Sequence, residues 1–139
     1  MTLLVTGCMA IAVLLILGTV VATSAQLARV RLLDVADGAA LDAADALDDR
    51  AYRSGLGDAV ALSGPTVWDS AETYLAVRER PERITWWSIA PGTGTPDGET
   101  AVVVVTGEVV LPVVGPLVEA VGGSVTITVT GAARAGLVG

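Results

Sequence analysis

A chain of 139 residues supports one ordinary domain, or a membrane segment followed by a domain of about 100 residues. Its formal net charge of −7 argues against nucleic acid as a partner and disfavours attraction to anionic lipid head groups. A single cysteine and no histidine exclude an intramolecular disulfide, a cysteine metal cluster and every catalytic triad built on histidine. We therefore expect no enzymatic activity, no catalytic, cofactor-binding or metal-binding residues, and no small-molecule substrate.

The first 28 residues carry no charged side chain and are mostly apolar. Because about 20 such residues cross a bilayer as a helix, we predict one transmembrane segment over residues 1–28. The residues expected inside the bilayer are Val13, Leu14, Leu15, Ile16, Leu17, Val20 and Val21. Two alternatives stay open, which are a buried helix of a soluble protein and a signal peptide cleaved after Thr23-Ser24-Ala25.

The orientation of this segment is the next question. Arg29 and Arg31 follow it, and the positive-inside rule alone would keep their side in the cytoplasm. Long domains cross the membrane largely regardless of charge, however. We therefore expect a single-pass protein of the cell membrane whose C-terminal domain is extracytoplasmic.

From Leu27 the pattern becomes amphipathic without a break. Apolar residues recur at three- and four-residue intervals, while acidic residues fall on the opposite side and are expected to be solvated. Since no proline occurs before Pro65, one helix is predicted from Leu3 to Tyr52, with residues 29–53 as an amphipathic extension. Gly38 is either simply tolerated there, a close packing site or a bend.

The small residues of the extension suit close packing against like helices of other proteins. The expected helix-packing face consists of Leu33, Ala36, Ala40, Ala44 and Leu47. On this interpretation, Ala40→Trp should disturb packing with partners and leave the C-terminal domain folded.

Residues 54–139 are expected to form a small α+β domain. Ser63-Gly-Pro-Thr66 is a helix-start signal, and it predicts a second helix from Pro65 to Arg80. Strands are predicted over Ile84–Ala90, Thr100–Leu111 and Ser124–Thr130, with a short helical turn around Leu117–Val121. A three-stranded antiparallel sheet with both helices packed on one face is the simplest arrangement of these elements.

Trp68, Trp86 and Trp87 are candidates for a binding surface. Neighbouring residues of a strand point to opposite faces, so Trp86 and Trp87 cannot enter one core. One of them should pack under the helices, and the other should be exposed or covered by a partner. Plain packing and a functional contact both stay open for the three side chains.

The N-terminal half resembles the TadE/TadG-like proteins of actinobacterial tight-adherence (Flp-type) pilus systems. The resemblance covers Val5 to Tyr52 and rests on an uncharged span, on Gln26-Leu27-Ala28-Arg29-Val30-Arg31-Leu32-Leu33, and on the Ala-Asp repeat from Asp34 to Leu47. It also fits the later layout of a short helix, valine-rich strands and a final strand that ends in Ala132-Ala133-Arg134-Ala135. The family's basic leader is not seen before Leu3, so the resemblance predicts no processing site.

The resemblance implies a pilin-like arrangement and a role as a minor pilin-like or assembly component of a secretion system. Membrane lipid and other pilus or secretion-system proteins would then be its partners. The alternative is a membrane-anchored cell-envelope domain that binds a protein or a wall polymer.

Overall fold

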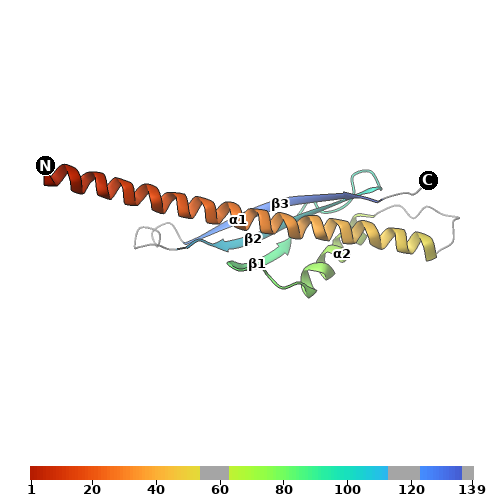
Figure 1. Cartoon of the computed structure of the whole chain (residues 1–139). Helices are drawn as coiled ribbons and strands as arrows, with labels where there is room; N and C mark the ends of the chain where they lie inside the picture. Colours follow the sequence, from red (N-terminus) through yellow and green to blue (C-terminus); the bar gives the residue numbers. More distant parts are fainter. Residues whose placement is uncertain (54–62, 113–122, 136–139) are drawn as a thin grey trace.

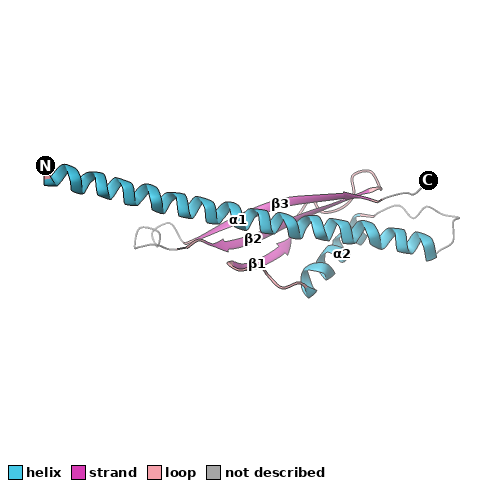
Figure 2. Cartoon of the chain, in the orientation of Figure 1, coloured by secondary structure: helices cyan, strands magenta, loops and turns pink. Residues whose placement is uncertain are grey.

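The computed structural model of the chain describes residues 1–53, 63–112 and 123–135, with residues 47–53 described by their backbone alone. Two helices and three strands follow one another in the order α1 (Thr2–Arg53), α2 (Gly64–Val77), β1 (Ile84–Ile89), β2 (Thr100–Val110) and β3 (Ser124–Arg134). This is the predicted α+β arrangement, and Figure 2 shows its elements. The helical turn expected around residues 117–121 lies outside the described residues.

Helix α1 runs for 52 residues without interruption, which corresponds to a rod about 78 Å long. No proline interrupts it, and alanine and leucine favour the helix along its length. Its N-terminal half projects beyond the rest of the molecule, while its C-terminal half lies along the sheet (Figure 1). The first buried side chain is that of Ala28, and the side chains before it are exposed or partly exposed.

The three strands form one antiparallel sheet in the order β1-β2-β3. In the central strand β2, side chains alternate between the two faces. One face points to the helices and is buried at Ala101, Val103, Val105 and Val109. The other face is partly exposed. A valine-rich strand that alternates in this way suits a sheet with helices on a single side.

Strand β3 is four residues longer than its sequence pattern predicted. That pattern ended the strand at Thr130, whereas the resemblance implied an end within Ala132–Ala135, and the pairing with β2 continues until Arg134 faces Thr100. Gly131, Ala132 and Ala133 have low intrinsic strand preference, and the backbone ladder to β2 decides their conformation. Local composition alone therefore underestimated this strand.

Helix α2 begins as its sequence signal predicts. Ser63 is the N-cap, and its hydroxyl accepts a hydrogen bond of 3.3 Å from the backbone amide of Thr66. The helix ends at Val77 rather than at Arg80, because Arg78 already has an extended backbone (φ −92°, ψ 137°). Its buried side chains, Val67, Ala71 and Leu75, join the core under the sheet.

The core lies between α1, α2 and one face of the sheet. The residues of α1 that enter it are Ala28, Leu32, Val35, Ala36, Ala39, Ala40, Ala43 and Ala44. Gly131 of β3 allows an especially close approach, since an added Cβ would lie 2.5 Å from the Ala36 carbonyl oxygen and the Asp37 amide nitrogen. The second half of α1 thus belongs to the same folded unit as the strands.

Candidate functional site

The expected membrane-spanning residues lie on the projecting half of α1. Val13, Leu14, Leu15, Ile16 and Val20 are exposed, and Leu17 and Val21 are partly exposed. Moving such side chains out of water gains roughly 1.5–3 kcal/mol each for complete burial. The helix is long and apolar enough to cross a membrane, and none of its apolar window is buried within the protein. The apolar window of α1 is therefore not part of the domain core, which α1 enters only from Ala28 onward.

The expected helix-packing face needs a correction. Ala36 and Ala40 are fully buried and Ala44 is 2% exposed, all within the chain's own core. Leu33 is 37% exposed, and the side chain of Leu47 is not described. The three alanines contact the chain's own sheet and α2, so they cannot receive a partner helix. Small residues at helical spacing suit both kinds of packing, and the sequence pattern could not distinguish them.

The outward face of α1 is a second surface, which the sequence analysis did not separate from the packing face. Leu27 and Val30 are 51% and 52% exposed, and they continue the apolar surface of the projecting half toward Leu33. Asp34 and Asp37 are also exposed and begin an acidic region beyond them. The apolar surface therefore extends past the uncharged segment for about one and a half helical turns.

A groove between α2 and β1 brings the tryptophans together. Its wider part has a volume of about 710 Å³ and is lined by Leu75, Ala76, Arg78, Glu79, Arg80, Trp86 and Trp87. An adjoining part of about 290 Å³ shares Leu75, Ala76 and Trp87 with it and also reaches Trp68. Trp87 packs against the core, while Trp86 is 42% exposed, so the predicted division of the two indoles is confirmed.

The two arginines of this groove are held by local contacts. Arg78 donates a hydrogen bond to the Tyr74 hydroxyl, and its guanidinium carbon lies 5.3 Å from the centre of the Tyr74 ring. Arg80 donates to the backbone carbonyl oxygen of Thr85. The groove therefore combines flat aromatic surface with ordered cations, a combination that suits stacking of a ring together with a polar group.

Glu108 lies on the sheet face that points away from the helices. Its carboxylate accepts hydrogen bonds from the hydroxyls of Ser124 (2.7 Å) and Thr85 (3.1 Å). These bonds, the one from Ser124 first, hold the pKa of Glu108 below its usual range. The group is thus a charged hydrogen-bond acceptor that ties the three strands together, and it is poorly suited to act as a general acid near neutral pH.

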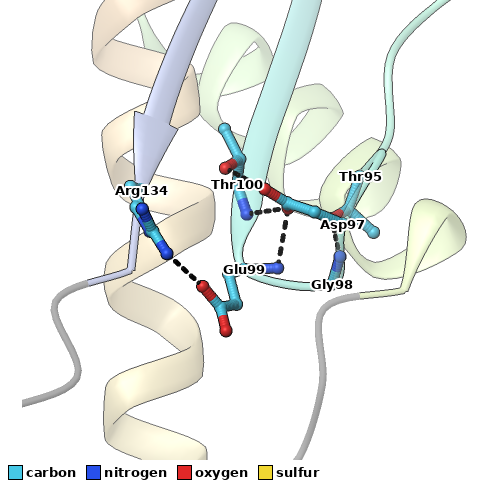
Figure 3. Close-up of polar contacts among 6 residues, drawn as sticks. All are labelled: Thr95, Asp97, Gly98, Glu99, Thr100 and Arg134. Atoms are coloured by element: carbon cyan, nitrogen blue, oxygen red, sulfur yellow. Dashed lines mark hydrogen bonds and ion pairs between the residues drawn. The ribbon is translucent and has the colours of Figure 1, made fainter.

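Asp97 organises the turn that leads into β2 (Figure 3). Its carboxylate accepts hydrogen bonds from the backbone amides of Glu99 (2.9 Å) and Thr100 (2.6 Å) and from the Thr100 hydroxyl (2.7 Å). These bonds, led by that from the Glu99 amide, lower the pKa of Asp97 to about 2. Next to the turn, Glu99 forms an ion pair of 2.5 Å with Arg134 of β3. These contacts are those of a structural turn.

Among the described residues, no group of three or more His, Cys, Asp and Glu side chains is placed to hold a metal ion. The surfaces that remain for function are the exposed apolar half of α1, its outward face and the tryptophan groove. Comparison of the chain with models of protein families, with curated proteins and with solved structures finds no match.

Proposed function

We propose that this chain is a membrane-anchored, pilin-like assembly component of a tight-adherence (Flp-type) pilus system and acts without catalysing a reaction. The observation that carries the proposal is the continuity of α1, whose first half is exposed and apolar while its second half forms part of the domain core. Because the proposed anchor and part of the domain core belong to the same helix, no flexible linker separates the membrane from the domain.

The continuity of α1 has a mechanical consequence for assembly. A domain on a flexible linker could rotate freely above the bilayer, whereas a domain built around a rigid helix keeps its height and direction relative to it. Lateral contact between such helices in the membrane would bring neighbouring domains side by side at a common height. This is the property that a subunit of a filament, or of its assembly platform, requires.

The outward face of α1 supports the same role. Leu27, Val30 and Leu33 stay exposed because the domain covers the opposite side of the helix. A continuous apolar surface that leaves the bilayer along a helix is suited to contact with a second apolar helix. On this proposal the domain is extracytoplasmic and its partners are membrane lipid and other pilus proteins.

The proposal is tested by placing a photoactivatable cross-linking residue at Val30 in cells that express the pilus system. We expect covalent adducts with a second copy or with another pilus protein. A cross-linker at Val77, which is 81% exposed near the end of α2, is the control and should give far fewer adducts. Adducts with lipid alone at position 30 would contradict the assembly role and leave the membrane anchor intact.

A second function, a cell-envelope domain that binds a protein or a wall polymer, is favoured by the tryptophan groove. Aromatic side chains that line an open groove offer a surface for stacking of sugar rings or apolar side chains. If this function holds, Trp86→Ala should abolish retention on purified cell wall, and Val30 should give no protein adducts. Neighbouring genes for a secretion ATPase and multi-spanning platform proteins would favour the pilus role instead.

A further inference from the structure

A small pocket lies where α1 leaves its uncharged segment. It forms between α1 and the turn that precedes β1, and its volume is about 150 Å³. Its lining residues are Ser24, Leu27, Ala28, Arg31, Glu82 and Arg83. The pocket shares Leu27 with the outward face of α1 and takes no part in the tryptophan groove.

The turn on one side of this pocket has an unusual backbone. Arg83 has φ 71°, and it is the only residue other than glycine with a positive φ in the parts of the chain that the structure describes. The turn is fixed at both ends, because the Arg83 carbonyl oxygen accepts from the Val110 amide (2.8 Å) and the Ile84 amide donates to the Pro81 carbonyl oxygen (3.2 Å).

Glycine adopts this conformation without cost, whereas an arginine there is strained. Folding alone would therefore favour glycine at position 83. The arginine side chain extends across the pocket toward α1, where one of its terminal nitrogens lies 3.5 Å from the Ser24 hydroxyl oxygen. The strained backbone thus points to a role for the guanidinium itself.

The charge of the pocket is opposite to that of the chain. Two guanidinium groups and one carboxylate line it, whereas the whole chain has a net charge of −7. Within the described side chains the ion pair joins Arg134 to Glu99, and neither Arg31 nor Arg83 is paired with a carboxylate. The net charge of the whole chain disfavours attraction to anionic lipid, but the charge of the side chains that line this pocket is positive.

The position of the pocket matches the surface of a bilayer. The uncharged segment ends at Ala28 and is long enough to cross the hydrocarbon region, so the α1 residues of the pocket, Ser24 to Arg31, lie where the helix reaches the lipid head groups. Helical side chains tilt toward the N-terminus, which directs Arg31 back toward Ser24, two turns earlier. Leu27 and Ala28 add apolar surface to the same pocket.

We infer that this pocket binds the phosphodiester group of an anionic phospholipid. Guanidinium groups hold phosphate oxygens through paired N–H donors, and the Ser24 hydroxyl is a further donor at the same place. A lipid held between α1 and the turn would fix the rotation of the domain about the helix axis relative to the bilayer. The inference rests on the membrane anchor of the proposed function and is independent of the pilus role.

The test uses the intact chain purified in detergent micelles. Phosphatidylglycerol or phosphatidylcholine with identical acyl chains is added, and the lipid that stays bound is counted by native mass spectrometry. We expect several-fold preferential retention of phosphatidylglycerol. Arg31→Gln and Arg83→Gly should each lower this preference several-fold, because each removes one of the two guanidinium groups that line the pocket. Arg83→Gly also relieves the backbone strain, so it should fold at least as well as the parent chain.

Arg29→Gln is the matched control, because it removes the same charge from an exposed position two residues from Arg31 that does not line the pocket. It should keep the preference. Equal retention of both lipids, or an equal loss in Arg29→Gln and Arg31→Gln, would overturn the inference. Full displacement of the lipid by millimolar inorganic phosphate would show a site for free anions instead. Failure of the pilus cross-linking test would leave these lipid measurements unchanged.

Discussion

The two halves of α1 share one helix and differ in what surrounds them. From Thr2 to Leu27 the side chains are exposed or partly exposed, and 13 of these 26 residues are leucine, isoleucine, valine or methionine. From Ala28 to Ala46 one side of the helix is buried against the sheet and α2, and six of its eight core residues are alanine. The larger apolar side chains therefore lie mostly outside the fold, and the smaller ones inside it.

The two halves therefore place apolar side chains in different surroundings. On the proposed role, the projecting half inserts into a bilayer, where large side chains increase the apolar area removed from water. The packed half needs close approach, because its backbone passes directly over Gly131 of β3. Hydrophobicity is common to both halves, and side-chain volume separates them.

The largest expected effect comes from one substitution placed in each half. Leu14 and Leu41 are 57% and 55% exposed, so they differ in location and hardly in exposure. Leu14→Arg should abolish stable membrane association, because an arginine at the centre of a spanning helix costs about 2.5–3.5 kcal/mol or more. Leu41→Arg should stay in the membrane fraction. The measurement is the share of the protein that resists extraction with alkaline carbonate. Equal extraction of the two variants would contradict the assignment of the membrane anchor to the first half of α1.

A second pair of variants tests the packed half. We expect Ala40→Trp to destabilise the domain by about 3 kcal/mol or more, since a fully buried alanine contacting the chain's own core leaves no space for an indole. Its matched control is Leu41→Trp, which places the indole on the exposed side and should change the free energy of unfolding by less than about 0.5 kcal/mol. Urea unfolding in detergent measures both. A folded Ala40→Trp variant would restore the partner-packing interpretation.

The smallest expected effect concerns the glycines of α1. Alanine is preferred to glycine within a helix by about 1 kcal/mol, and a Cβ at Gly18 meets nothing within 4 Å. Gly18→Ala should therefore be neutral or slightly stabilising. At Gly38 the added Cβ would overlap the Tyr74 hydroxyl, so Gly38→Ala should lose stability, by about 1 kcal/mol.

Tyr74→Phe removes the atom that meets this Cβ and supplies the control. Adding Gly38→Ala to Tyr74→Phe should cost clearly less than adding it to the parent chain, as measured by thermal unfolding. If the cost were the same in both backgrounds, Gly38 would not be a packing site against Tyr74.

Much of the fold follows from local patterns. The absence of proline correctly predicted the long helix, and Ser63 and Pro65 predicted the start of α2. The valines of β2 predicted the central strand. The adjacent tryptophans were correctly assigned to opposite faces because strand geometry requires it. The end of β3 and the early end of α2 were missed, since the ladder to β2 and the extended backbone at Arg78 set them.

The candidate sites depended more strongly on tertiary structure. Arg31 and Arg83 are far apart in sequence, and only the packing of the turn before β1 against α1 brings them to one pocket. The tryptophan groove likewise needs α2 to lie beside the edge strand β1. No spacing rule in the sequence predicts either juxtaposition.

The sequence by itself determined that an uncharged apolar helix continues into an amphipathic one, because helix propensity and periodicity are local properties of neighbouring residues. Only the tertiary structure decided what the amphipathic half contacts. Ala36 and Ala40 fit a partner helix and a sheet equally well. They pack against the chain's own β3 because Gly131, almost 100 residues later, has no side chain and lets that strand lie directly against the α1 backbone.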